Sequence, residues 1–280
     1  MRESSNPVFR SLPKQQQGGY AQFGPGYAAG AQQVYQGYQT EPFIEQKGVS
    51  RPLTIDDVVT KTGITLSVLS LVAVASYFLV SVNIGLAGPL TAVGFLGGLV
   101  LVAIFGRKQD NPAIVLSYAA FEGLMLGAFS FVVANFTVSD VSAGVLITQA
   151  VLGTIGVFAG MLVVYKTGAI RVTPKFTRMV VAALFGVLAL MLGNLVLALF
   201  GVGGGQGMGL RSGGALAIIF SLVCIGLAAF MFLIDFDAAD QMIRAGAPEK
   251  AAWGIALGLT VTLVWLYLEI LQLLSYFYRD

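Results

Sequence analysis

The chain has 280 residues, of which 56% are apolar and only 11% charged, and its mean hydropathy is +0.82. Soluble domains carry roughly 25% charged residues, so this composition excludes an ordinary soluble fold. It indicates that the lipid bilayer is the protein's solvent and first partner. The net charge of +2 is small, and we expect no nucleic-acid partner.

Two absences narrow the chemistry further. The sequence contains no histidine, which excludes histidine general acid–base catalysis, Ser-His or Cys-His hydrolase sites and histidine metal ligation. Its single cysteine, Cys224, lies in an apolar run and is expected to be a small buried hydrophobe. With no clustered nucleophile and base in the sequence either, we expect no enzyme activity and no cofactor.

Residues 1–50 differ in composition from the rest. The stretch 15–38 is built mainly from Gln, Gly, Ala and Tyr, which predicts a disordered cytoplasmic tail because no face could be buried. Its tyrosines could also act as weak self-association sites. The tail lacks the apolar region of a signal peptide. A helix is then predicted to begin near Thr54, which can cap it, with Asp56 and Asp57 at its positive end.

The remainder, residues 51–280, is predicted to be an all-α membrane domain. Seven apolar runs each reach the roughly 20 residues that cross a hydrocarbon core of about 30 Å, and Gly, Pro and Asn residues separate several of them. The runs are too long and lack the period of two expected of a β-barrel. The predicted spans of this seven-transmembrane-helix bundle are 63–82, 86–106, 112–134, 141–165, 178–200, 214–236 and 251–277.

The positive charges predict the orientation. When Lys and Arg are counted outside or at the edges of these spans, 14 fall on the side of the N-terminus and only two, Arg211 and Arg279, on the other. Because cytoplasmic loops carry the excess of Lys and Arg, we expect the N-terminus in the cytoplasm, the C-terminus outside and the protein in the plasma membrane.

Glycines spaced four residues apart predict where helices approach closely. Such pairs occur in three predicted spans: Gly94 with Gly98, Gly123 with Gly127, and Gly156 with Gly160. Small residues at this spacing allow two backbones to pack together within a membrane. The alternative is that some of these glycines mark places where a helix bends or moves.

The predicted spans hold carboxylates but no Lys or Arg well inside them. The seventh span lacks the lysine that a retinal Schiff base would need. Glu122 is expected near mid-bilayer and Glu269 in the outer half of the seventh span. An ionised acid at the bilayer centre costs at least about 2.5 kcal/mol, so these residues indicate a role in ion or proton handling. Asp235, Asp237 and Asp240 lie at the inner end of the sixth span, where solvation alone could explain them.

Other polar residues suit an interior path. Tyr118 and Trp265 each precede a buried acid by one turn, and Gln272 follows Glu269 by three residues. Gln149 and Asn194 add hydrogen-bonding groups to the fourth and fifth spans. Calcium prefers carboxylate and carbonyl oxygens, which this set could offer. Without histidine, pH sensing near neutrality would have to use the acids.

Three segments together resemble one known family. They are Tyr118–Gly127, Ile234–Asp237 with the following Gly246-Ala247-Pro248, and Val264–Leu271, which reads Val-Trp-Leu-Tyr-Leu-Glu-Ile-Leu. In combination they are similar to the third, sixth and seventh helices of the bacterial branch of the Bax inhibitor family. The resemblance covers roughly residues 54–280.

The resemblance implies a bundle whose last helix is surrounded by the other six, and a pH-sensitive calcium leak gated by acids on the sixth and seventh helices. Matched by motif, those acids are Asp237 and Glu269, which would also be the candidate calcium ligands. Their sequence separation, divided unequally by the turn, places Glu269 about 18 Å further from the turn than Asp237. Glu269 could instead approach Glu122 or stand alone near the outer mouth.

Two functions follow as hypotheses. The first is a pH-sensitive cation leak channel or proton-coupled exchanger, with calcium as the permeant ion and the five acids named above along its path. The second is a membrane regulator that transports nothing and controls a client membrane protein, such as a protease, or a stress response.

Overall fold

The computed structural model describes residues 51–106, 110–136 and 141–278, so the tail predicted at 1–50 lies outside the described residues. Within these ranges the chain is helical, and seven helices are long and apolar enough to cross a membrane. The predicted all-α, seven-span fold is confirmed. The helices are α1 (Ile55–Val82), α2 (Ala87–Phe105), α3 (Pro112–Phe136), α4 (Ala143–Thr167), α5 (Pro174–Leu199), α6 (Ala215–Arg244) and α7 (Ala251–Phe277), with short 3₁₀ turns η2 (Ile84–Leu86) and η3 (Val202–Gly205).

The first helix begins where its capping residues predict. The Thr54 hydroxyl accepts a hydrogen bond from the Asp57 amide, and the Asp57 carboxylate accepts one in return from the Thr54 amide. This capping box satisfies two backbone donors that the helix cannot satisfy itself and stabilises the helix start by about 1 kcal/mol.

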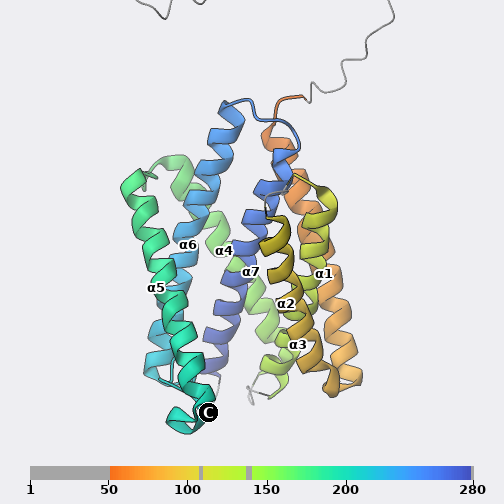
Figure 1. Ribbon diagram of the computed structural model, residues 1–280, viewed down its shortest axis with the longest axis vertical. Helices are drawn as coiled ribbons and strands as arrows, with labels where there is room; N and C mark the ends of the chain where they lie inside the picture. Colours follow the sequence, from red (N-terminus) through yellow and green to blue (C-terminus); the bar gives the residue numbers. More distant parts are fainter. Residues whose placement is uncertain (1–50, 107–109, 137–140, 279–280) are drawn as a thin grey trace, which may run out of the picture. The chain divides into compact units, whose positions relative to one another are not determined.

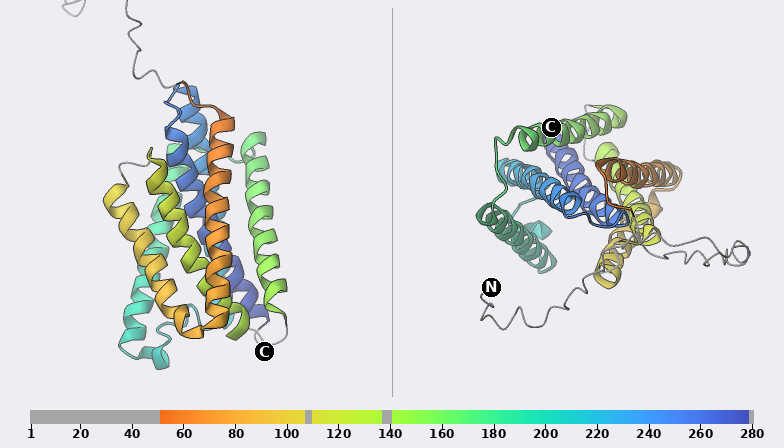
Figure 2. Two further views of the ribbon diagram at one scale, coloured as in Figure 1. Left: turned by 90° about the vertical axis from the view of Figure 1, so that its right-hand side faces the viewer. Right: turned by 90° about the horizontal axis from the view of Figure 1, so that it is seen from above.

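The last helix is the most buried of the seven. It packs mainly against α1, α3, α4 and α6 (Figures 1 and 2), whereas α2 packs on α3 and α5 packs on α6, both on the outside. The family resemblance implied that the last helix is surrounded by the other six, and the structure gives it extensive contacts with these four. Side chains of α7 therefore face interior positions on most sides.

Glycines create the closest helix contacts. A Cβ added at Gly127 would collide with the Ala73 carbonyl oxygen of α1, and one added at Gly123 would lie 2.6 Å from the Leu69 carbonyl oxygen. A Cβ at Gly94 of α2 would lie 2.5 Å from a backbone oxygen of α3. Close packing at these two glycine pairs is confirmed. Gly156 and Gly160 of α4 have no such neighbour within 4 Å, so the prediction fails for the third pair.

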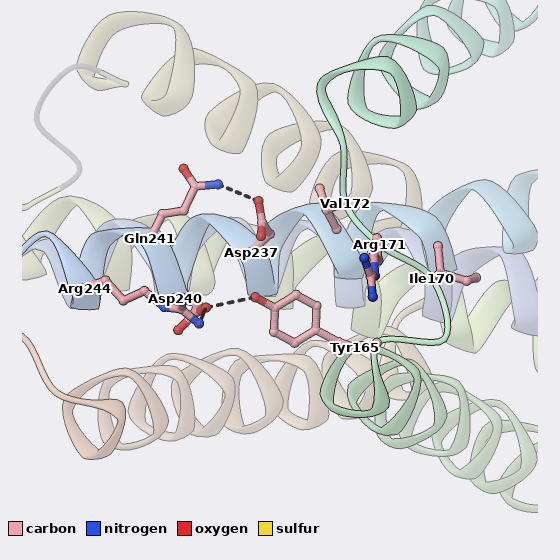
Figure 3. Close-up of a pocket in the computed structure, with 9 residues that line it drawn as sticks. Tyr165, Ile170, Arg171, Val172, Asp237, Asp240, Gln241 and Arg244 are labelled. Atoms are coloured by element: carbon pink, nitrogen blue, oxygen red, sulfur yellow. Dashed lines mark hydrogen bonds and ion pairs between the residues drawn. The ribbon is translucent and has the colours of Figure 1, made fainter.

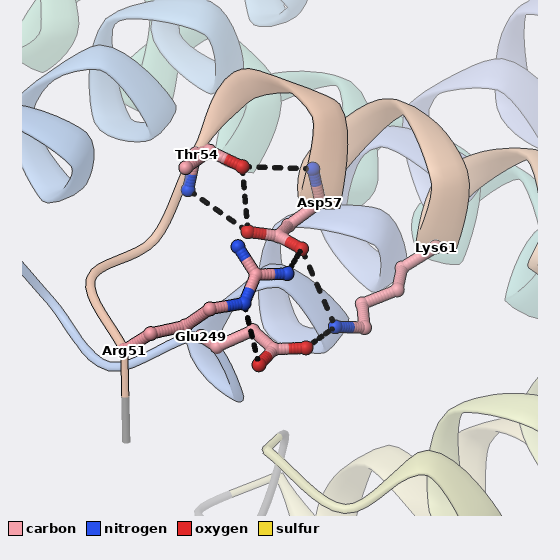
Figure 4. A network of polar contacts seen from close by, with 5 residues as sticks. All are labelled: Arg51, Thr54, Asp57, Lys61 and Glu249. Atoms are coloured by element: carbon pink, nitrogen blue, oxygen red, sulfur yellow. Dashed lines mark hydrogen bonds and ion pairs between the residues drawn. The ribbon is translucent and has the colours of Figure 1, made fainter. Parts of the chain in front are cut away.

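A group of four charged residues, Arg51, Asp57, Lys61 and Glu249, fastens the start of α1 to the loop between α6 and α7 (Figure 4); we call it the polar clamp. Lys61 Nζ lies 2.7 Å from Glu249 Oε1, and Arg51 lies 2.6 Å from Asp57 and 3.3 Å from Glu249. Two backbone hydrogen bonds, from the Leu53 amide to Ala247 and from the Glu249 amide to Arg51, reinforce it.

The polar clamp is expected to loosen in acid. A hydrogen bond from Lys61, with the charges of Lys61 and Arg51, lowers the pKa of Glu249. A lowered pKa stabilises the folded state above the ordinary carboxyl pKa of about 4.3, and this contribution is lost as pH falls through the folded value. We therefore expect hydrogen exchange at the Leu53 amide to gain an acid-induced opening below about pH 4. In Glu249→Gln, exchange of the Leu53 amide, corrected for the intrinsic rate of an unprotected amide, should be fast at all pH values. Equal protection of this amide in the wild type and in the variant would contradict the prediction.

Candidate functional site

Glu269 of α7 is the least exposed acid that forms an ion pair among the described residues. Its side chain is 2% exposed, and its two carboxylate oxygens lie 2.6 and 3.1 Å from the two terminal nitrogens of Arg211. Arg211 is charged at every physiological pH, so the pair is a carboxylate held by a guanidinium in bidentate geometry. The charge of Glu269 is thus compensated from within the protein.

Arg211 belongs to the glycine-rich loop 201–214 between α5 and α6. Seven glycines of this loop have positive φ angles, which allow sharp successive turns that other residues rarely adopt. Asn194 of α5 anchors the loop, because its side-chain oxygen accepts a 2.7 Å hydrogen bond from the Met208 amide. The guanidinium also lies 5.6 Å from the centre of the Phe220 ring, a favourable cation–π distance. The loop therefore positions the Arg211 guanidinium beside Glu269 of α7.

The sequence did not predict this pair. Arg211 was considered only as one of two positive charges on the outer side, and Glu269 was expected to approach Glu122 or to stand alone. The structure shows neither arrangement. The available signal was that charged residues are rare inside a membrane span. A buried acid in the outer half of a span needs a partner, and Arg211 was the cation expected in the loop on that side.

Asp235 is the sixth-helix acid that faces α7. Its carboxylate accepts a 2.7 Å hydrogen bond from the Thr262 hydroxyl, and Gly258, one turn earlier on α7, leaves space beside it. Asp235 is half-buried, and Thr262 is 4% exposed. This hydrogen bond joins α6 to α7.

Asp237 and Asp240 instead line an open cavity of about 310 Å³ beside the loop between α4 and α5 (Figure 3). Asp237 accepts a 2.6 Å hydrogen bond from Gln241, while Asp240 binds Arg244 at 2.7 Å and accepts a 3.3 Å hydrogen bond from Tyr165. Further residues of the lining are Gly168, Ile170, Arg171 and Val172. This cavity carries both signs of charge.

The structure does not bring Asp237 and Glu269 together. Asp237 lies seven residues before the end of α6, whereas Glu269 lies 18 residues after the start of α7. On antiparallel helices the difference of 11 residues corresponds to about 16 Å. The two carboxylates bind different partners and cannot share one calcium ion in this arrangement. Among the described residues, no three Asp, Glu, Cys or His side chains form a group able to hold a metal ion.

Glu122 lies midway along α3 and is 8% exposed. Its Oε2 atom has no hydrogen-bond partner among the described residues. The side chain faces α2, where a Cβ at Gly98 would lie 3.0 Å from Oε1. The three membrane-embedded acids therefore differ in their surroundings: Glu269 binds a cation, Asp235 accepts a hydrogen bond from a hydroxyl group, and Glu122 lies between Tyr118 and the glycines of α2.

These features define a multi-pass helical membrane protein with buried carboxylates on α3, α6 and α7. Its sequence matches the family described as Bax inhibitor 1 like over residues 6–279, which is nearly the whole chain. The protein belongs to this family, which confirms the family indicated by the three segments. No curated protein matches the sequence significantly.

Proposed function

We propose that the protein is a pH-sensitive cation leak channel or exchanger with calcium as its permeant ion. The observation that carries the proposal is the buried pair of Glu269 and Arg211. A carboxylate in a membrane interior attracts a cation, and here a loop of the protein itself supplies one. In the proposed mechanism Arg211 takes the place of a permeant cation beside Glu269, and this conformation would be the closed state.

The acids on α6 and α7 suggest the route. Asp237 and Asp240 line the open cavity, Asp235 lies deeper beside Thr262, and Glu269 lies furthest along α7. Carboxylate oxygens at successive depths are ligands that calcium prefers. With the N-terminus in the cytoplasm of a plasma-membrane protein, the cavity would open inward and Arg211 would close the outer side.

Substitution of the two interior acids tests the route. We expect Glu269→Gln and Asp235→Asn each to lower calcium flux into proteoliposomes by about tenfold or more, equivalent to about 1.4 kcal/mol. Asp110→Asn, which removes an exposed acid between α2 and α3, is the control and should leave the flux unchanged. Wild-type flux in both interior variants would remove these residues from the route.

The polar clamp favours a second candidate, a regulator of a membrane-protein client. It fastens residues 51–61, at the start of α1, to the α6–α7 loop, so a partner bound to the preceding segment could act on α7. Removal of residues 1–48 separates the two candidates. A channel should keep its flux after this truncation, whereas a regulator should lose the client that in-cell crosslinking detects with the full chain.

A further inference from the structure

Glu122 differs from the other acids of the membrane interior because one of its carboxyl oxygens is buried without a partner and, of the described residues, only Tyr118 acts on the group. The side chain is 8% exposed, and its Oε2 atom has no hydrogen-bond partner among the described residues. Glu269, by contrast, is held by Arg211, and Asp235 accepts a hydrogen bond from Thr262. An ionised carboxylate without a counter-ion is strongly unfavourable at this depth. A protonated carboxyl group is neutral, so its burial at the same depth is much less unfavourable.

The α2 helix covers this carboxyl. A Cβ at Gly98 would lie 3.0 Å from Glu122 Oε1 and 3.4 Å from the ring of Tyr118. One turn away, Gly94 lies against the α3 backbone, since its Cβ would be 2.6 Å from the Met125 amide nitrogen. The glycines of α2 thus form a flat surface on α3, and any side chain at position 98 would press on the carboxyl.

The surroundings contain few groups that could share the charge. On α3 itself, Tyr118 is the titratable residue that acts on Glu122. The sequence of α2 contains no titratable residue. The next residue, Gly123, lies against Leu69 and Val72 of α1. On the side of α7, Leu257 packs against Tyr118. Neither contact brings a charged group from α1 or α7 to this level.

We propose that Glu122 is a proton-binding site, covered in its neutral form by Gly98 of α2. Proton release requires α2 to separate from α3. The O–H bond then breaks, the proton passes to water, and the carboxylate that remains is free to attract a cation. Coupling of this step to transport rests on the proposed function, whereas the proton site itself does not.

Infrared spectroscopy of the folded protein in an ester-free detergent tests the site without measuring transport. We expect a band from a protonated, dry carboxyl group at neutral pH. The band should be absent in Glu122→Gln and retained in Asp110→Asn. In Glu122→Asp the band should shift, which provides a second test if the glutamine variant fails to fold. A neutral-pH band unchanged in both Glu122 variants, or no band in the wild type, would overturn the proposal.

Deuterium exchange of the same carboxyl tests the cover. Gly98→Ala places a methyl group against Oε1, and overpacking of this kind should make opening, and hence exchange into D₂O, roughly tenfold faster. Gly88→Ala on the same helix is the matched control, because its Cβ would meet nothing within 4 Å. Equal exchange rates in the two variants would overturn the role of α2.

The two proposals fail separately. A protonated Glu122 in a protein that conducts no calcium would refute the proposed function and support the proton site. Calcium flux through a protein that shows no Glu122 band would support the proposed function and refute the proton site.

Discussion

Replacement of Arg211 by glutamine is expected to lower the free energy of unfolding by about 3–5 kcal/mol near neutral pH, because it leaves the Glu269 carboxylate buried without a counter-ion. Thermal unfolding in detergent measures the change. The double variant Arg211→Gln with Glu269→Gln should recover most of the loss, since both groups are then neutral and can hydrogen bond to each other.

An exposed ion pair provides the matched control. Arg244 binds Asp240 at 2.7 Å, but its side chain is 78% exposed. Exposed pairs contribute only about 0–1 kcal/mol, so Arg244→Gln should hardly change the unfolding temperature. If Arg211→Gln is as stable as Arg244→Gln, or if the double variant is no more stable than the single one, Arg211 does not neutralise Glu269 in the folded protein.

The second large effect is expected at Gly127. A Cβ there collides with the Ala73 carbonyl oxygen, which is part of the α1 backbone and cannot rotate away. Gly127→Ala should therefore force α1 and α3 apart and destabilise the protein by about 1–3 kcal/mol. Its unfolding temperature in detergent gives the measurement.

Gly156→Ala on α4 is the control for this prediction. The added methyl group meets no atom within 4 Å, and alanine is the better helix former by roughly 1 kcal/mol. This variant should be as stable as the wild type or more stable. Equal destabilisation of both variants would mean that the close α1–α3 contact does not exist.

The number and type of helices could be predicted because they depend on local properties. A run of about 20 apolar residues is the simplest way to cross a bilayer with every backbone group satisfied. The limits of the apolar run and of the helix need not agree, however. The sixth span was predicted to end at residue 236, but α6 continues to Arg244, since a helix can extend beyond the hydrocarbon core.

Packing partners were harder to predict. Glycine spacing identifies a smooth helix face, but the sequence does not say whether another helix or lipid covers that face. Gly123 and Gly127 meet α1, whereas Gly156 and Gly160 meet no other helix closely. The two cases look the same in the sequence.

The acids themselves could be predicted as candidates because charge is rare inside a membrane. The contacts that these acids make could not be predicted. Asp235 and Asp237 are two residues apart and therefore point about 200° apart around α6, so only the position of α7 decides which of them faces the interior. Arg211 lies 58 residues from Glu269 in sequence, and the fold of a glycine-rich loop brings it there.

The central claim, that buried carboxylates control a calcium leak, is tested most directly by calcium flux into proteoliposomes that contain folded wild-type protein, at about pH 6 and about pH 8. We expect a measurable flux that is larger at the higher pH, because only ionised carboxylates attract the cation. No flux at either pH, or the same flux at both, would contradict the claim.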